Sequence, residues 1–413
     1  MAFWGFTLLT PEHESVAKSQ PTYLWKIRSI DTMKTSRDMA RDILTDGELE
    51  KELQTIKNLG ANYVAIDTPY DEEFLPLLKR WVIFARRTGL KVWFRGNWSS
   101  WEGWFDYPKN MTPEEHNQET AKFIETNPDL FEDGDIFDPC SECENSGFWK
   151  QPEDNAEYNQ FIQDQRKVVK DSFSKIKKRV YTNIFSINGG RAKEVLSKKT
   201  LDTLDNVVTI DHYFKDPSSM SQYIDYFSQN YHTTVLVGEF GAPIPDINGS
   251  MNENEQAQFI NEVFKIMYKD KENVLGINYN VLTGGTTSLL NEDGTPREAT
   301  EIIKNYFIPG GISGTVTNTV GDRLPNIKVK TSDELNSTTT DSLGRYTLTV
   351  PANAVDEIII KDNKYKTISK KETFNRGTKI TRDFILEPRT INLTYRIRLI
   401  IKYIGDYISK ITR

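Results

Sequence analysis

Between residues 25 and 308, short apolar runs alternate with longer segments in which apolar residues recur every three or four positions. Short runs rich in β-branched and aromatic residues predict strands, and the longer period predicts helices. The expected strands are 25–30, 62–67, 91–95, 134–138, 179–185, 207–213, 234–240 and 276–282. The expected helices are 47–60, 72–89, 112–126, 155–176, 190–205, 218–231, 253–270 and 297–307.

The order of these elements predicts the fold class. Strands that alternate with helices imply a parallel sheet, and eight such units in roughly 280 residues favour an α/β fold with a closed eight-stranded β/α (TIM) barrel over 25–308. A doubly wound open sheet is the alternative. It is less favoured because no glycine-rich phosphate loop follows any early strand. Residues 1–24 are expected to form an N-terminal extension to the barrel.

The pattern changes after Pro309-Gly310-Gly311. Over 311–388 polar and apolar residues alternate with a period of two, threonine is frequent, and turn signals such as Ser342-Leu343-Gly344 separate the runs. This pattern predicts a small antiparallel β-sandwich that follows the barrel.

The segment 389–413 carries six Lys or Arg residues and one Asp, so its net charge is +5. Ile391, Leu393 and Tyr395 alternate as in a strand, whereas five isoleucines share one helical face, namely Ile397, Ile400, Ile401, Ile404 and Ile408. A basic amphipathic helix could make peripheral contact with an anionic membrane or a cell surface. The alternative is a terminal element that docks on its neighbour or is partly disordered.

Composition limits the function further. A chain of 413 residues with 37% hydrophobic residues suits one large domain and a smaller one. The net charge of −7 argues against a nucleic-acid partner. The sequence contains no run of about 18 apolar residues, so we expect no membrane-spanning helix. The opening MAFWGFTLLTPEHE lacks a basic region and a cleavage site, so it is a poor signal peptide.

The stretch TVLVGEFGAP at 234–243 suggests a chemical site, because an apolar strand ends on a glutamate, Glu239, between two glycines. Active sites of β/α barrels lie at the C-terminal ends of the strands. The fourth strand is followed by Glu142 and Glu144, which would share that end of the barrel with Glu239. Paired carboxylates are what glycosidic bond cleavage needs. The alternative is that these carboxylates cap helices or pair with Arg95.

Aromatic residues crowd the same end of the barrel. Their flat apolar faces suit stacking on sugars, so we expect a carbohydrate substrate. The candidate aromatic residues are Trp98, Trp101, Trp104, Trp149 and Tyr279. Polar candidates for substrate binding after the strands are Arg95, Asn97 and Asn145.

These motifs resemble one enzyme superfamily. TVLVGEFG, the preceding DHYF and the following GINYNVLTGGTTSLLNEDGTPREA are similar to retaining glycoside hydrolases of clan A, the cellulase- and mannanase-like superfamily. The resemblance implies that Glu239 is the nucleophile and that Glu142, or as a fallback Glu144, is the acid/base. It also implies that His212 and Tyr213 contact the site and that the tyrosine orients the nucleophile.

The resemblance implies no metal and no organic cofactor, and we expect a monomer. The segment 311–388 resembles the prealbumin-like, carboxypeptidase regulatory-like domain, a common accessory module of surface proteins. For that reason we expect a secreted or cell-surface protein, although no signal peptide is visible.

Two cysteines and two other functional readings complete the predictions. Cys140 and Cys143 are expected to form a disulfide, or two packed thiols, that stiffens the loop of Glu142.

Instead of a hydrolase, the barrel could be a catalytically silent glycan-binding or attachment module. A zinc carboxypeptidase would need His116, Glu119 and His232 to meet, but His116 and Glu119 are expected to face solvent on a polar helix.

Overall fold

A computed structural model describes residues 23–145 and 155–412 of the chain. Eight parallel strands form one sheet in the order β4-β3-β2-β1-β8-β7-β6-β5. The sheet closes where Phe137 N donates to Tyr181 O at 3.0 Å and Tyr181 N donates to Asp135 O at 2.8 Å. The strands are β1 (Ile27–Asp31), β2 (Tyr63–Ile66), β3 (Lys91–Phe94), β4 (Ile136–Phe137), β5 (Ser186–Asn188), β6 (Val207–Asp211), β7 (Thr234–Phe240) and β8 (Val274–Tyr279).

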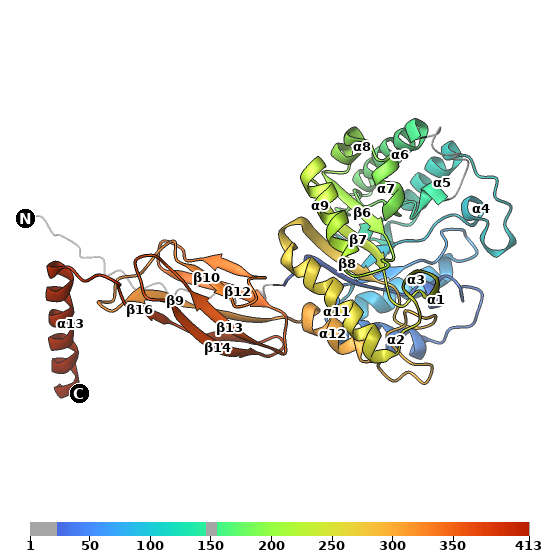
Figure 1. Ribbon diagram of the computed structural model, residues 1–413. Helices are drawn as coiled ribbons and strands as arrows, with labels where there is room; N and C mark the ends of the chain where they lie inside the picture. Colours follow the sequence, from blue (N-terminus) through green and yellow to red (C-terminus); the bar gives the residue numbers. More distant parts are fainter. Residues whose placement is uncertain (1–22, 146–154, 413) are drawn as a thin grey trace, which may run out of the picture.

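Helices surround this barrel (Figure 1). The longer ones bury one apolar face against the strands, and α2, α5 and α11 begin with capping boxes that satisfy their first N–H groups. The helices are α1 (Met33–Ser36), α2 (Asp46–Asn58), α3 (Leu75–Arg87), α4 (Ser99–Glu102), α5 (Pro113–Thr126), α6 (Asn155–Lys175), α7 (Gly189–Val195), α8 (Lys198–Thr203), α9 (Ser219–Tyr231), α10 (Pro245–Asn248), α11 (Glu253–Lys269) and α12 (Ala299–Phe307). The predicted β/α barrel is confirmed.

Two of the differences from the sequence prediction concern the fifth strand and the fifth helix. The fifth strand begins at Ser186 rather than at residue 179, and Tyr181 makes only an isolated bridge to Ile136. The helix expected over 190–205 is divided into α7 and α8, because Ser197 starts a new helix by accepting a hydrogen bond from Thr200 N at 3.2 Å.

The barrel interior changes from apolar to polar along the strands. Residues near the strand starts form a separate apolar cluster that includes Ile27, Tyr63, Trp93 and Leu236. Trp93 therefore lies in the barrel interior and not at its rim. Two residues beyond Trp93, Arg95 begins a buried polar layer at the strand ends.

The second domain is a β-sandwich with a core of its own. One sheet has the order β11-β10-β13-β14, and the other contains β12, β9 and β15, with β16 also paired to β9. Most pairs are antiparallel, whereas β15 and β16 run parallel to β9. The strands are β9 (Gly310–Asn318), β10 (Lys328–Thr331), β11 (Ser337–Thr339), β12 (Arg345–Val350), β13 (Ala354–Ile360), β14 (Ile368–Phe374), β15 (Lys379–Thr381) and β16 (Phe384–Leu386).

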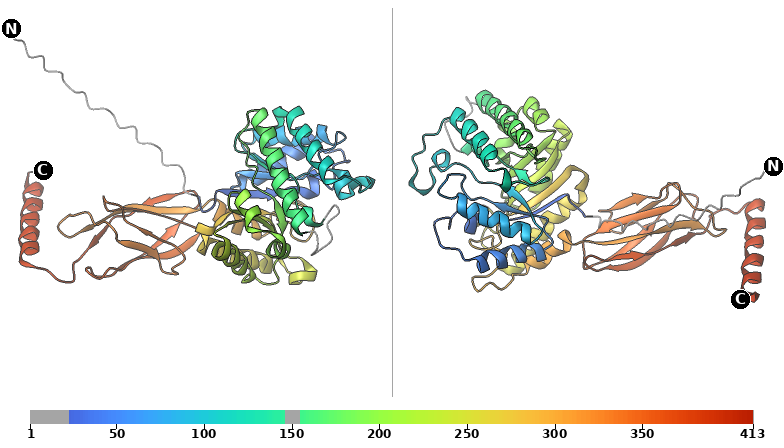
Figure 2. Two further views of the ribbon diagram at one scale, coloured as in Figure 1. Left: turned by 90° about the horizontal axis from the view of Figure 1, so that it is seen from above. Right: turned by 180° about the vertical axis from the view of Figure 1, so that it is seen from behind.

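Barrel, sandwich and last helix follow one another along an elongated molecule (Figures 1 and 2). The barrel contacts the sandwich where Arg376 pairs with Glu301 at 2.6 Å and Ala352 N donates to Asn305 O at 2.8 Å. The segment after the sandwich forms α13 (Leu393–Ile411), so of the strand and helix patterns in this segment the helix is the one observed. None of the residues of α13 is buried. Among the described residues, no helix has both the length and the apolar character needed to cross a bilayer.

Candidate active site

A cavity of about 230 Å³ opens at the C-terminal ends of the barrel strands. Its lining comes from the loops after β1, β2, β3 and β4 and from the end of β7. Glu142 and Glu239 both line it, together with Met33, Arg37, Asp67, Arg95, Asn97, Glu102, Trp104, Ser141 and Asn145.

Three donors hold the carboxylate of Glu239. The Tyr213 hydroxyl and the Asn280 amide donate to Oε1, the latter at 2.6 Å, and Arg95 contacts Oε2 at 3.2 Å. The side chain is only 15% exposed. An ionised carboxylate can be kept in such a place because these donors replace the lost water.

The glycines beside Glu239 make room for this arrangement. A Cβ at Gly238 would lie 2.3 Å from Asp211 Oδ1, and a Cβ at Gly241 would lie 1.9 Å from Asn280 O. Larger residues at these positions would displace two neighbours of the glutamate. The G-E-F-G sequence is therefore a packing requirement of this strand end.

Arg95 is the central cation of the buried polar layer. Its guanidinium lies 2.7 Å from Asp211 Oδ2 and 3.5 Å from Asp31 Oδ2, in addition to Glu239. It also donates to Gly238 O, on the residue before the glutamate. Burial raises the pKa of Asp31 and Asp211. The positive charge of the Arg95 guanidinium opposes this rise in both carboxyls.

Glu142 reaches the cavity from a constrained loop. Its φ of 49° lies in the left-handed region that residues other than glycine rarely adopt. The backbone is held there because Glu142 N donates to Ser186 O at 2.8 Å. Asn145 Nδ2 donates to Glu142 Oε2 at 3.2 Å. Burial, followed by the charge of Glu239, raises the pKa of Glu142, as a general acid requires.

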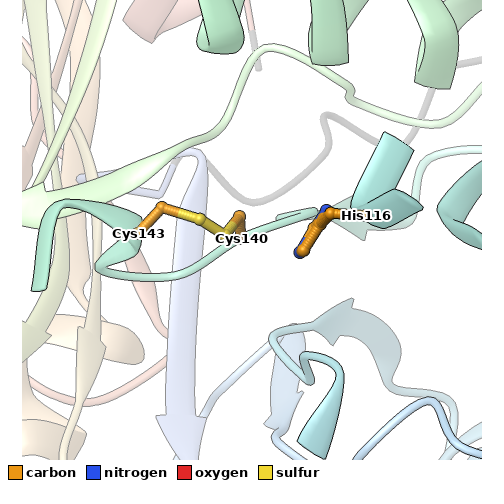
Figure 3. Close-up of side chains that lie close together, drawn as sticks. All are labelled: His116, Cys140 and Cys143. Atoms are coloured by element: carbon orange, nitrogen blue, oxygen red, sulfur yellow. A yellow bond between two sulfur atoms is a disulfide. The ribbon is translucent and has the colours of Figure 1, made fainter. Parts of the chain in front are cut away.

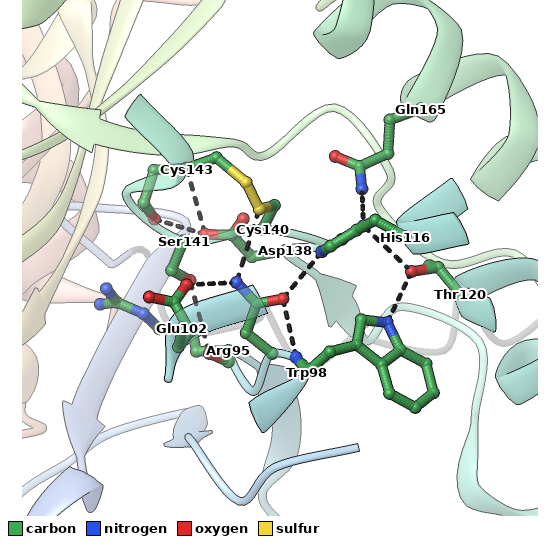
Figure 4. Close-up of a disulfide and its surroundings, with 12 residues drawn as sticks. Arg95, Trp98, Glu102, His116, Thr120, Asp138, Cys140, Ser141, Cys143 and Gln165 are labelled. Carbon is green, nitrogen blue, oxygen red and sulfur yellow. Dashed lines mark hydrogen bonds between the residues drawn. A yellow bond between two sulfur atoms is a disulfide. The ribbon is translucent and has the colours of Figure 1, made fainter. Parts of the chain in front are cut away.

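A disulfide between Cys140 and Cys143 spans this loop (Figure 3). Asn97, at the end of the third strand unit, donates to Cys140 Sγ at 3.5 Å and to Glu102 Oε1 at 2.5 Å. The oxygen of Asn97 accepts from His116 Nε2 at 2.8 Å. Figure 4 shows this network beside the loop of Glu142. The disulfide, rather than two free thiols, stiffens the loop.

Glu144 takes a different direction from Glu142. It is buried, it does not line the cavity, and its Oε1 accepts from Asn188 N at 2.6 Å at the start of α7. Burial raises the pKa of Glu144 to about 8. This position fits a structural role at the start of α7, and it favours Glu142 over Glu144 for acid/base work.

Only one of the described candidate tryptophans faces the cavity. Trp104 lines it, with the Arg37 guanidinium 5.0 Å from the ring centre. Trp98 is buried, donates to Thr120 Oγ1 at 3.1 Å and packs on Phe123. Trp101 is fully buried and stacks on Phe161. The expectation that Trp98 and Trp101 stack on sugar is therefore corrected, since neither offers a free face. Trp149 lies outside the described residues.

Two further candidates lie away from the cavity. Tyr279 is fully buried, and its hydroxyl donates to Thr287 O at 2.9 Å, so it is a core residue and not a substrate contact. His212 packs against Tyr223 and Phe214, and burial lowers its pKa to about 4. Its backbone N donates to Glu239 O at 2.9 Å, which connects it to the nucleophile strand through the main chain.

The sequence reasoning missed six residues of the site, Met33 and Ser141 of the cavity lining among them. Asn280 holds Glu239, while Arg37, Asp67 and Glu102 line the cavity. Asn280 follows the eighth strand, so its position after a strand end was a usable signal. Arg37 directly follows α1 and Glu102 is the last residue of α4, and no periodicity marks either of these short helices.

The zinc site required by the carboxypeptidase reading does not form among the described residues. Only His116, Cys140 and Cys143 come together as metal-ligand types there. The two sulfurs are bonded to each other, and both nitrogens of His116 are engaged, by Asn97 and by Gln165. The expectation that His116 faces solvent is wrong: it is fully buried, because it bridges two amides inside the barrel wall.

The family model described as "Glycosyl hydrolase catalytic core" matches residues 198–306, which include Glu239, Tyr213 and Asn280. Residues 198–306 are thus part of a glycoside hydrolase catalytic core. This agrees with the resemblance inferred from the strand-end motifs, and it makes the cavity the candidate active site of a glycoside hydrolase. No curated protein matches the chain.

Solved structures with the same barrel share little sequence with this glycoside hydrolase. A GH5_18 protein from Bifidobacterium longum subsp. infantis aligns with a TM-score of 0.52 and 14% identity over 71% of this chain and 83% of its own. A GH5_18 protein from Bifidobacterium longum subsp. longum in complex with Manb1-4GlcNAc gives 0.51 and 12%, over 71% and 82%. A family 5 xyloglucanase from Paenibacillus pabuli gives 0.50 and 12%, over 68% and 98%. At this identity the likeness concerns the fold.

Proposed function

We propose that this glycoside hydrolase cleaves O-glycosidic bonds of a poly- or oligosaccharide with retention of configuration, using Glu239 as nucleophile and Glu142 as acid/base. One observation carries the proposal: the two carboxylates open onto the same cavity in different environments. Glu239 is surrounded by three donors, whereas Glu142 has a raised pKa. Such a division of environments assigns an ionised and a protonated carboxyl.

In the first step, the carboxylate of Glu239 attacks the anomeric carbon while the carboxyl of Glu142 gives its proton to the leaving oxygen. The carbon–oxygen bond of the glycoside breaks, and an ester bond to Glu239 forms. Tyr213 and Asn280 hold Oε1, and Arg95 holds Oε2, so the attacking carboxylate is already oriented.

In the second step, the ionised Glu142 takes a proton from water, and the water oxygen displaces Glu239 from the sugar. As the charge of Glu239 is consumed in the ester, the charge repulsion that raises the pKa of Glu142 disappears. The pKa of Glu142 then falls, and this change turns the acid of the first step into the base of the second.

Sugar binding is assigned to Trp104 and to the polar groups around it. The ring of Trp104 supplies an apolar face, and Arg37 and Asn145 supply hydrogen bonds along the same cavity. The amide of Asn97 is already paired with Glu102, Cys140 and His116. Glu142 makes no ion pair within residues 23–145 and 155–412, so its carboxyl is available to the substrate.

The test uses a panel of β-linked polysaccharides and aryl glycosides with Glu239→Ala and Glu142→Ala variants. We expect Glu239→Ala to lower kcat by at least about 10⁴-fold. Azide should restore activity and give a glycosyl azide of inverted configuration. Glu142→Ala should retain turnover only on substrates with good leaving groups, and azide should there give the retained configuration.

Glu144→Gln is the matched control, because glutamine still accepts the hydrogen bond from Asn188 N without touching the cavity. This variant should keep wild-type activity. Full hydrolysis by Glu239→Ala would overturn the proposed nucleophile. Polysaccharide binding without any hydrolysis across the panel would instead favour a glycan-binding barrel.

A further inference from the structure

Helix α13 contacts the β-sandwich through one side only. The Tyr395 hydroxyl lies 2.7 Å from Thr319 Oγ1, Lys402 Nζ donates to Thr319 O at 2.9 Å, and Arg398 donates to Asp322 Oδ2 at 2.8 Å. Residues 395, 398 and 402 are spaced by three and four positions, so they share one helical face. The polar face of α13 is thus the face held against the protein.

The opposite face is apolar, and none of the described residues covers it. Ile404 follows Lys402 by two positions and therefore points about 160° away around the helix axis. Side chains on this face are between 51 and 67% exposed, namely Ile397, Ile400, Ile401, Ile404, Tyr407 and Ile408. The contacts to the sandwich fix the helix with its isoleucines turned outward.

The charges on α13 indicate what covers this face. The helix carries Arg396, Arg398, Lys402 and Lys410 against the single Asp406. A second copy of the helix would bring like charges together, and the apolar stripe is wider than the two-position seam of a coiled coil. Anionic headgroups complement a wide apolar stripe with basic borders, as in helices that lie in the plane of a membrane surface.

We propose that α13 binds the surface of an anionic lipid bilayer, with its isoleucine face among the acyl chains and the side chains of Arg396 and Lys410 at the headgroups. A helix of 19 residues would lie over about 28 Å of the surface. The barrel lies at the other end of the molecule, beyond the sandwich (Figure 1). Bound in this way, the hydrolase holds its catalytic barrel away from the lipid by the length of the sandwich.

The test is flotation of the full chain with vesicles of phosphatidylcholine alone or mixed with phosphatidylglycerol. We expect binding to the anionic vesicles, with a decrease as salt is raised. Ile400→Glu together with Ile404→Glu should weaken binding by at least about 100-fold. Arg396→Glu together with Lys410→Glu should weaken it by about tenfold or more, and neither residue contacts the sandwich among the interactions given above.

Ile385→Glu is the matched control. Ile385, on β16 of the sandwich, is 55% exposed, as Ile404 is, so its substitution adds a negative charge at an equally exposed site and should leave binding unchanged. Folding of each variant is checked by its circular dichroism and thermal transition. No residue of α13 is buried, so these should match wild type.

Three results would overturn the proposal. The first is absence of flotation with anionic vesicles. The second is equal binding to neutral vesicles at every salt concentration. The third is binding that survives Ile400→Glu with Ile404→Glu. Sedimentation without lipid tests a distinct alternative. If the chain is a dimer that these two substitutions convert to a monomer, and if no vesicle binding is found, the apolar face binds a second copy of the chain.

Discussion

The side-chain amide of Asn280 lies 2.6 Å from Oε1 of Glu239 and 3.0 Å from the Tyr213 hydroxyl, which donates to the same oxygen. Asn280, which follows β8, and Tyr213, which follows β6, thus fix the carboxylate at the end of β7. This contact makes Asn280 a positioning residue for the proposed nucleophile, and its effect can be separated from folding.

Asn280→Ala should lower kcat/KM by about 10- to 100-fold, because a hydrogen bond to a charged group is lost. Asn280→Asp should be worse, since it places a second carboxylate beside Glu239. Steady-state kinetics and the thermal transition are the measurements. Asn58→Ala on the exposed side of α2 is the control and should match wild type. If the loss of activity in Asn280→Ala came with a large decrease in the thermal transition temperature, the role of Asn280 would be structural only.

Activity should decrease on the basic side of the pH profile as Glu142 loses its proton. The raised pKa of Glu142 depends on burial and then on the charge of Glu239. Glu239→Gln removes that charge, so the pKa of Glu142 should fall toward its ordinary value. Titration of carboxyl carbons by NMR in the two proteins measures this directly. An unchanged pKa of Glu142 would show that the two carboxyls do not interact.

Trp104 and Trp101 should respond differently to alanine substitution. Trp104 lines the cavity, so Trp104→Ala should raise KM by about tenfold while the unfolding free energy stays near wild type. Trp101 is fully buried, so Trp101→Ala should lower the unfolding free energy by about 3–5 kcal/mol. Kinetics and urea unfolding of both variants check the pair. A Trp104→Ala protein with normal KM would remove this ring from the substrate site.

His116 should make the protein less stable as the pH falls. Burial lowers its pKa to about 3 in the folded chain, whereas an unfolded histidine has a pKa of about 6.5. Between these values the unfolded chain binds a proton that the folded chain does not, so the unfolding free energy falls with falling pH. The loss is at most about 1.4 kcal/mol per pH unit, or about 2 kcal/mol from pH 6.5 to pH 5.

The measurement compares urea unfolding at pH 7 and pH 5 for wild type and His116→Gln. The variant should lose about 2 kcal/mol less between the two pH values, because glutamine does not titrate. His232→Gln, at an exposed position after α9, should keep the wild-type difference. Identical pH dependence of His116→Gln and wild type would contradict the assignment of this effect to His116.

The parts of the fold that follow from local patterns were predictable. The strand 234–240 is observed with the predicted ends, and the capping box of Thr112 starts α5 where the sequence places it. Strand five was misplaced because Tyr181 and the residues after it carry a strand-like pattern, yet the ladder with β6 begins only at Ser186. The local pattern could not report which of these residues would find a partner.

For the candidate site, the sequence alone determined the glutamate at the end of β7, the carboxylates after β4 and the aromatic segment between 97 and 108, because strand ends and residue types are local properties. Only the tertiary structure decided that Glu142 enters the cavity while Glu144 binds the backbone N–H of Asn188. It also decided that Trp104 is exposed to the cavity while Trp101 is buried, and that Asn280 completes the support of Glu239. The physical reason is that each of these outcomes depends on contacts between segments far apart in the chain, which compete for the same interior space and the same hydrogen-bond partners.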